Sequence, residues 1–367
     1  MKHVVLLIPT HWSAVLGGAE YQAKILAEHL IASGRFKITL ACRRFAADYR
    51  PAGYEIRQIA PHTGLRTRGF FLDYFRLNRL LEELAPDSIY QRVACGHTGI
   101  AAKYALRSGC NMIWHVSSDN DVTPVNHWGF RDNLVPFRRI EKAAVEYGIR
   151  HVPRIVVQTH HQSSLLKQHY QREATALVRN FHPLPHEVID KSGVTTVLWI
   201  GNLKWVKNPQ AFIALARALE ELRDVRFSVV GDPFGEPASA REIEAHAKHL
   251  PRLCFLGKQS QEQVNELLSK SHLLVNTSHF EGFPNTFIQA WMRQVPVLSL
   301  NVDPDGLLAG EGIGFCAQGD EMALERSLRQ LLSDRTRREQ MGLRAQRYAG
   351  AQHSERNMLA LIELLER

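Results

Sequence analysis

Three segments of the 367-residue sequence carry glycines, cations and carboxylates at spacings that suit anion or sugar binding. In the first, Gly17-Gly18-Ala19-Glu20 follows an apolar run and begins a helical pattern, so bare amides and a helix N-terminus can approach a ligand. The spacing differs from the GxGxxG fingerprint of dinucleotide-binding proteins. The segment predicts a ligand loop, and an ordinary turn in which Glu20 favours the helix dipole is the alternative.

The second segment, Trp199–Pro209, leaves an apolar run and enters a helix at its proline. Lys204 and Lys207 lie close to that helix start. Two ammonium groups add full charges to unpaired helix amides, and together they can grip a diphosphate. Taken alone, the pair is equally explained as two solvated loop lysines.

The third segment, Phe280–Gln289, is predicted to be a strand-to-helix turn. Glu281 precedes a glycine there, and Pro284 is expected at the first helical position. A proline at that position is followed by unpaired helix amides, which form an anion site. Without further context, Glu281 is equally explained as an acid that favours a helix start.

Metal chemistry has little support in the sequence. Asp119-Asn120-Asp121 has the Asp-x-Asp spacing of some metal-dependent transferases, but the 18 histidines show no HExxH or similar ligand spacing. The five cysteines stand singly, without the close pairs of metal or redox sites. We therefore expect no metal and no cofactor, and cysteines that are reduced core residues of a cytoplasmic protein.

The charge is concentrated in the first half of the chain. Residues 1–190 hold 24 of the 45 lysines and arginines against 16 of the 37 acids, so the whole net charge of +8 lies there. An anionic partner is expected for this half: a lipid surface, a phosphorylated acceptor or nucleic acid. The segment Arg66–Arg79 mixes arginines with aromatics at near-helical spacing, which suits either an anionic membrane or the rim of a core helix.

The elements that must position these segments follow a βαβ pattern. Short apolar runs such as 4–8 and 197–200 alternate with helical patterns such as 19–32 and 209–222, so two parallel, doubly wound α/β domains are expected. Two prolines within 181–186 mark the boundary. We predict domains at 1–183 and 184–350, and a C-terminal helix at 351–367 that packs back on the first domain. No apolar run reaches the roughly 20 residues that span a bilayer.

Together, in this order, the three segments resemble the retaining glycosyltransferases of family 4 with the GT-B fold, over the whole chain. The Gly-Gly-Ala-Glu loop matches in full, and Lys207 matches the lysine of the family's Gly-Arg-Leu…Lys segment. Glu281 matches the first glutamate of the Glu, seven residues, Glu motif. Two positions depart from the family: Asn202 stands where an arginine is usual, and Gln289 stands in place of the second glutamate.

The resemblance implies a transfer of sugar from a UDP- or GDP-sugar to a glycan or lipid-linked acceptor in surface polysaccharide synthesis, with retained anomeric configuration and no metal. It implies catalytic roles for Lys207, Glu281 and His115, where His115 ends the strand 113–115 and faces the donor sugar. Gln289 is expected to bind ribose, because an amide can still hydrogen-bond hydroxyls. The donor-binding residues it implies are Gly17, Gly18, Asn202, Lys204, Gly282, Phe283, Asn285, Thr286 and Gln289.

Three other functions remain as alternatives. A nucleotide-sugar epimerase on the same fold would need its own acid and base carboxylates, and Glu281 alone fits that poorly. A non-catalytic nucleotide-sugar or glycan-binding protein is favoured by Asn202 and Gln289, since a missing guanidinium removes charge from the diphosphate unless Lys204 supplies it. Nucleic-acid binding lacks any recognisable motif, so we expect none. The expected location is cytoplasmic, peripheral on the membrane face.

Overall fold

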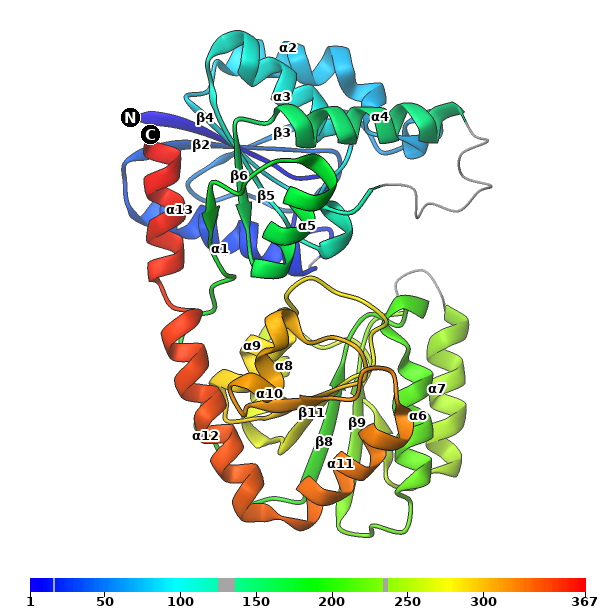
Figure 1. Ribbon diagram of the computed structural model, residues 1–367. Helices are drawn as coiled ribbons and strands as arrows, with labels where there is room; N and C mark the ends of the chain where they lie inside the picture. Colours follow the sequence, from blue (N-terminus) through cyan, green and yellow to red (C-terminus); the bar gives the residue numbers. More distant parts are fainter. Residues whose placement is uncertain (16, 125–135, 234–236) are drawn as a thin grey trace. The chain divides into compact units, whose positions relative to one another are not determined.

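The computed structural model describes residues 1–15, 17–124, 136–233 and 237–367, which divide into two compact units. Unit 1 comprises Met1–Phe181 and Glu355–Arg367, and unit 2 comprises His182–Ser354. The sequence prediction sets the first boundary slightly later, after Pro183, and ends the second domain at residue 350. Each unit is an α/β body built on its own parallel sheet (Figure 1).

The sheet of unit 1 is parallel throughout its described residues and has the strand order β3-β2-β1-β4-β5-β6-β7. The chain runs from β1 through β2 to β3 on one side, and then crosses from β3 to β4 on the other side of β1. This change of direction makes a switch point, where such sheets bind ligands at the carboxyl ends of their strands. The strands are β1 (Lys2–Leu7), β2 (Phe36–Cys42), β3 (Glu55–Gln58), β4 (Ser88–Arg92), β5 (Asn111–His115), β6 (Arg154–Val157) and β7 (Ala176–Leu177).

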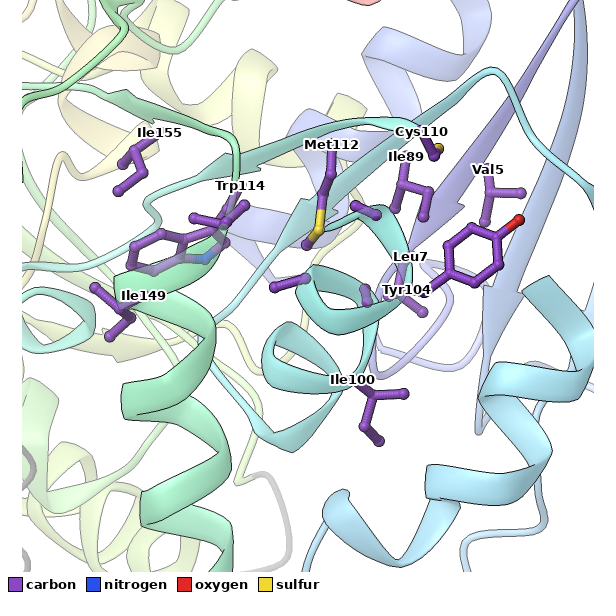
Figure 2. Close-up of a cluster of buried hydrophobic side chains, with 14 of the residues drawn as sticks. Val5, Leu7, Ile89, Ile100, Tyr104, Cys110, Met112, Trp114, Ile149 and Ile155 are labelled. Carbon is purple, nitrogen blue, oxygen red and sulfur yellow. The ribbon is translucent and has the colours of Figure 1, made fainter. Parts of the chain in front are cut away.

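Helices cover both faces of this sheet, so its central strand β1 is buried at every position after Lys2. In β1, Val5 and Leu7 join one core and Val4 and Leu6 join the other, as the two-residue period of a strand requires. Figure 2 shows the first core, in which strand side chains such as Trp114 pack against helices α3 and α4. The helices of unit 1 are α1 (Gly18–Ala32), α2 (Tyr74–Leu84), α3 (Gly96–Ser108), α4 (Pro136–His151), α5 (His160–Tyr170) and α13 (Arg356–Glu366).

Helices α3 and α4 approach each other closely because both carry a glycine at the contact. A Cβ atom on Gly99 would lie 2.1 Å from the carbonyl oxygen of Ala144, and a Cβ on Gly148 would lie 2.7 Å from the Gly99 nitrogen. Any larger residue would force the two backbones apart. These glycines therefore fix α3, whose first turn lies at the carboxyl edge of the sheet.

The C-terminal helix α13 packs on unit 1, which confirms the predicted return of the chain. Met358, Leu361 and Leu365 join the core that α1 covers, and Ser88 Oγ donates a hydrogen bond to the Leu365 carbonyl oxygen at 2.7 Å. The helix therefore belongs to the first body although the chain reaches it through the second. The predicted break near residue 350 lies at His353 instead, after α12.

The sheet of unit 2 is also parallel in its described residues, with the order β10-β9-β8-β11-β12-β13. Its strands are β8 (Thr195–Ile200), β9 (Val225–Val230), β10 (Leu253–Phe255), β11 (Leu273–Asn276), β12 (Val297–Ser299) and β13 (Gly314–Cys316). Its helices are α6 (Pro209–Ala218), α7 (Pro237–His249), α8 (Gln261–Lys270), α9 (Asn285–Met292), α10 (Leu307–Gly310), α11 (Glu321–Ser333) and α12 (Arg335–Gln352).

The predicted fold class, two doubly wound parallel-sheet bodies, is confirmed. Several elements escaped the sequence reading, among them β3, β4, α3 and α5, because their apolar runs are short or mixed with polar residues. Cys254 is exposed, so not every cysteine is a core residue as expected. Within the described ranges, no helix combines the length and the apolar character needed to cross a bilayer.

Candidate active site

Lys207 and Glu281 form an ion pair at the carboxyl edge of the unit 2 sheet. Lys207 ends the short turn η6 (Trp205–Lys207) in the loop after β8, and Glu281 lies in the loop after β11. Because β8 and β11 are adjacent and parallel, both loops leave the same edge. Lys207 Nζ lies 2.7 Å from Glu281 Oε2, and the two side chains are 27% and 15% exposed. The fold thus joins residues from two separate motifs.

Hydrogen bonds to backbone carbonyl oxygens also join these two loops. Thr277 Oγ1 donates to the Asn208 carbonyl oxygen at 2.7 Å and accepts a hydrogen bond from Trp199 Nε1 at 2.9 Å. The His279 N–H donates to the Val206 carbonyl oxygen at 2.9 Å. The position of the lysine is therefore set by the loop contacts as well as by the ion pair itself.

The surroundings of Glu281 keep its carboxylate charged. Burial alone raises the pKa of this carboxyl, but the Lys207 ammonium and hydrogen bonds from Ser278 and Asn276 outweigh that effect, so its pKa lies below the usual value. Ser278 Oγ donates to Glu281 Oε1 at 2.6 Å and Asn276 Nδ2 donates to the same oxygen at 2.9 Å. Both Glu281 oxygens are thus engaged in a fixed orientation.

Asn202 and Lys204 lie in the same loop as Lys207, as predicted from their spacing. Lys204 directly precedes the turn that holds Lys207, so both ammonium groups come from one short segment. The start of the loop is fixed by a close backbone approach, because a Cβ on Gly231 would lie 2.2 Å from the Gly201 carbonyl oxygen. Only glycine fits there. The roles of Asn202 and Lys204 toward a diphosphate stay predictions.

Helix α9 begins at the same edge of the sheet. It starts at Asn285, with the extended Pro284 as N-cap, whereas the sequence predicts Pro284 as the first helical residue. Burial lowers the pKa of His182 to about 4, so its neutral ring donates from Nε2 to Asn285 Oδ1 at 3.1 Å. Asn285 and Thr286 are half-buried in the first turn. The positive end of the helix dipole therefore adds to the cations of the lysine loop.

Two predicted donor-binding residues of the same segment, Gly282 and Phe283, are buried. The Phe283 ring is 5% exposed and packs against Trp291 and His353, so it belongs to the core of unit 2. Gly282, which precedes Phe283 in the sequence, is also buried. The Phe283 ring is therefore a core group, because an aromatic ring at this turn gains more from core packing than from solvent exposure. The roles of Gly282 and Phe283 in donor binding stay predictions.

Gln289 is held by a partner that the sequence analysis missed. Its side chain is 5% exposed, and Nε2 donates to Asn265 Oδ1 in α8 at 3.0 Å. This bond fixes which end of the amide is the donor, and it aims the remaining acceptor, Oε1, away from Asn265. A glutamate here would lack that donor and could pair with Asn265 only by accepting from its Nδ2.

In unit 1, the Gly-Gly-Ala-Glu segment forms the start of α1. Gly17 is the N-cap, with an extended backbone, and Gly18 is the first helical residue. A Cβ on Gly17 would lie 2.5 Å from Glu20 Oε2, so the carboxylate folds back over the bare glycine. Glu20 therefore favours the helix dipole, and a ligand that approaches Gly17 meets this carboxylate.

His115 ends β5, as expected, but its ring points into unit 1. It is 1% exposed; Nδ1 accepts a hydrogen bond from Tyr90 at 2.8 Å, and Nε2 donates to the Val178 carbonyl oxygen at 3.2 Å. Burial, with a further contribution from Arg92, lowers the pKa of the imidazole well below its usual value. Both ring nitrogens are used internally, so the expectation that the His115 side chain faces a donor sugar is corrected: the ring is a buried structural group.

The two acids of the Asp-x-Asp segment accept hydrogen bonds within unit 1, Asp121 from its own turn and Asp119 from α5. Asp121 Oδ2 accepts hydrogen bonds from Ser117 and Ser118, and Asp119 Oδ1 accepts one from Gln162 at 3.0 Å. In the part of the chain that the structure describes, no three histidine, cysteine or acidic side chains gather in metal-binding geometry.

The comparisons with known proteins agree on one family. Residues 186–348 match the family model described as glycosyl transferases group 1, and residues 16–184 match the one described as glycosyltransferase family 4. The chain is 29% identical, over 43% of its length, to a D-inositol 3-phosphate glycosyltransferase of Nocardia farcinica. The aligned part covers 37% of that protein, and the chain spans less than half the length of the curated relatives that it matches.

Two solved structures share the whole fold at low identity. The first is WaaG, a glycosyltransferase involved in lipopolysaccharide biosynthesis, with a TM-score of 0.77 and 19% identity over 98% of this chain and 99% of that one. The second is Anabaena HepE in complex with UDP-glucose, with a TM-score of 0.75 and 16% identity over 99% of this chain and 98% of that one.

Proposed function

We propose that this chain, which belongs to the family 4 (group 1) glycosyltransferases with the GT-B fold, transfers a sugar from a UDP- or GDP-sugar to a glycan or lipid-linked acceptor. The observation that carries the proposal is the Lys207–Glu281 pair, held at the carboxyl edge of the unit 2 sheet beside a second lysine and a helix N-terminus. Structures similar to this chain include one that holds UDP-glucose, which supports a nucleotide-sugar donor.

The proposed chemistry follows from where charge develops. When the bond between the sugar C1 and the phosphate oxygen breaks, negative charge grows on the diphosphate. Lys207 uses one of its three N–H donors on Glu281, so the others can meet phosphate oxygens. Lys204 and the α9 dipole add to this stabilisation, which acts without a metal. Glu281, fixed by Ser278 and Asn276, would accept hydrogen bonds from sugar hydroxyls.

The second half of the reaction forms the bond from C1 to an acceptor hydroxyl oxygen. We propose that the acceptor attacks from the side of the leaving group, and that its proton passes to the departing phosphate oxygen. The anomeric configuration is then retained. The family resemblance supports this route, and the stereochemistry of the product tests it directly.

We further propose that the acceptor is met at the cytoplasmic face of a membrane, during surface polysaccharide synthesis. The support is the positive charge of the first half, together with a segment of unit 1 in which Leu65 and Phe75 are 63% and 84% exposed among arginines. The expected amphipathic helix at 66–79 is only partly present, because α2 begins at Tyr74. Exposed apolar groups among cations suit an anionic lipid surface.

The first experiment measures release of free nucleotide from a panel of UDP- and GDP-sugars, in chelator, with and without a membrane lipid extract. We expect one donor to be turned over, faster with lipid, and NMR of the product to show the anomeric configuration of the donor. Release that depends on added metal would contradict the metal-independent route. Inverted product would contradict the retaining one.

The second candidate function is a non-catalytic nucleotide-sugar or glycan-binding protein. Asn202 and Gln289 favour it, since both replace charged residues that the family uses. Saturable donor binding without release under any condition of the panel would establish this candidate and reject the transferase.

Gln289 is expected to act in binding rather than in chemistry. Substitution of Gln289→Ala should raise KM for the donor about tenfold, the effect of losing one or two hydrogen bonds, with little change in kcat. Asn265→Ala should raise KM less, because it frees the Gln289 amide to rotate without removing it. Steady-state kinetics with the identified donor check both variants. Gln263→Ala, which lies in α8 as Asn265 does, is the control. An unchanged KM for Gln289→Ala would exclude the residue from the donor site.

A further inference from the structure

Unit 2 has a cavity at the amino edge of its sheet, opposite the edge that carries Lys207 and Glu281. The cavity has a volume of about 130 Å³ and lies beside the first residue of β8, Thr195, the residue before β11, His272, and the first turns of α12. Its lining contains Lys191 and Arg338. Nothing in the proposed sugar transfer uses this cavity.

Lys191 and Arg338 form no ion pair within the described residues. Lys191 Nζ donates to the carbonyl oxygens of Leu268, at 2.9 Å, and Ser271. Arg338 is 7% exposed, and its Nη1 donates to the Leu331 carbonyl oxygen at 2.6 Å. Neutral carbonyls satisfy hydrogen-bond donors but do not cancel a charge, so the half-buried Lys191 and the buried Arg338 share one small cavity without a directly bonded counter-ion among the described residues.

The other charged groups around the cavity do not supply that counter-ion. Glu339 is the only carboxylate among the lining residues, and its Oε1 is 2.7 Å from Arg335 Nε. Behind Lys191, Arg293 is paired with Glu187 at 2.8 Å. Glu339 and Asp334 favour the charged form of Arg338 from a distance, but neither forms an ion pair with it among the described residues.

The remaining neighbours of Lys191 are a histidine and an aspartate. His272 Nδ1 accepts from the Thr196 N–H at 3.1 Å, and Nε2 donates to the Lys191 carbonyl oxygen at 3.1 Å, which is the pattern of a neutral ring. Asp190 accepts from Ser192 at 2.9 Å and favours the charged form of Lys191 from a distance, without pairing with it.

We propose that this cavity binds a small tetrahedral oxyanion, the phosphate group of inorganic phosphate or of a phosphomonoester, between Lys191 and Arg338. The charge, the size and the buried donors all match such a group. Bound there, the anion bridges the segment before β8 to the start of α12 and stabilises unit 2. The site is independent of the sugar-transfer reaction.

Binding of the anion is expected to depend on pH. Burial, assisted by Arg293 and opposed by Asp190, lowers the pKa of Lys191 to about 7. An anion favours the charged ammonium, so its binding should be accompanied by proton uptake of about half a proton at pH 7. Affinity should therefore be highest below pH 7 and should fall as the pH rises above it.

Calorimetric titration with sulfate tests the proposal, because sulfate is tetrahedral and does not itself titrate near pH 7. The titration uses the full chain carrying Lys207→Ala, so that the opposite edge cannot contribute, at constant ionic strength in chloride. We expect one saturable site whose affinity is at least about tenfold higher at pH 6 than at pH 9. Buffers of different ionisation enthalpy measure the proton uptake.

Variants and a second pair of probes complete the test. Lys191→Met should abolish sulfate binding, and Lys270→Met, an exposed lysine nearby, should leave it unchanged. If Lys191→Met does not fold, the pH dependence of sulfate binding and the proton uptake, both measured on the chain with native Lys191, decide whether the proposal holds. Tighter binding of ribose 5-phosphate than of inorganic phosphate would assign a phosphomonoester, and equal binding would assign the free ion. Absence of a saturable site, or binding without proton uptake, would overturn the proposal.

Discussion

Substitution of Lys207→Ala is expected to lower kcat for sugar transfer by about 100- to 1000-fold, the loss typical of a preorganised group that stabilises charge in the transition state. The ammonium is fixed 2.7 Å from Glu281 by loops that are themselves hydrogen-bonded together, so it is in place before the charge develops. The measurement is nucleotide release with the donor that the panel identifies.

The matched control is Lys270→Ala. Lys270 and Glu266 form a lysine–glutamate pair with the same 2.7 Å separation, but it is exposed on α8. This variant should retain full activity. Equal losses in both variants would indicate a general charge effect, and an unchanged kcat in Lys207→Ala would remove Lys207 from the catalytic machinery.

The ion pair predicts the behaviour of Glu281 as well. The double variant Glu281→Gln/Lys207→Ala should raise the activation free energy of sugar transfer by less than the sum of the increases in the two single variants, because each single variant disturbs the same contact. Since the pKa of Glu281 lies below its ordinary value of 4.5, the carboxylate stays charged across about pH 5 to 8. The loss of activity in Glu281→Gln should therefore be constant over that pH range.

The second large effect concerns stability. Asp73→Ala should lower the free energy of unfolding by about 3 to 5 kcal/mol, since it leaves a buried cation without its counter-ion. Asp73 is fully buried, and its Oδ2 accepts from Arg43 Nε at 2.6 Å and from His97 Nε2 at 2.8 Å. The Arg43 guanidinium also stacks over Phe70, at 4.2 Å from the ring centroid. Urea unfolding measures the loss.

The control for Asp73 is an exposed acid of the same unit. Glu82 pairs with Arg107 at 3.2 Å, with both side chains more than half exposed, so Glu82→Ala should change the free energy of unfolding by less than about 1 kcal/mol. A loss in Asp73→Ala no larger than this would show that the buried cluster contributes no net stability.

The sign of the pH dependence follows from the Asp73 pKa. Burial raises it, but hydrogen bonds from His97 and Arg43 outweigh burial and bring the pKa below its ordinary value of 3.8. The stabilisation is therefore fully present above about pH 4 and is lost as the pH falls through the folded-state pKa. The difference between the natural chain and Asp73→Asn should shrink in that acid range, as unfolding curves at pH 3 and pH 6 would show.

The sequence alone was sufficient for the architecture and for the edge of the sheet at which the candidate site lies. Strand and helix periods mark elements such as β1, predicted at 4–8, and α1, predicted at 19–32, to within a few positions, because burial repeats along a single element. Lys207 and Glu281 could be assigned to one edge because the carboxyl ends of parallel strands always share it. Polar residues at the end of β11, such as Asn276 and Ser278, were visible signals of partners for Glu281.

Only the tertiary structure decided where individual polar side chains point. His115 and Phe283 lie in motifs that suggest ligand contacts, yet both are buried, because partners such as Tyr90 and Trp291 come from elsewhere in the chain. The contact of Asp73 with Arg43 and His97 likewise joins three segments that share no local pattern. The hydrophobic pattern along one element indicates which of its faces is buried. The hydrogen bonds and charges that satisfy a buried polar group, however, come from elements distant in sequence.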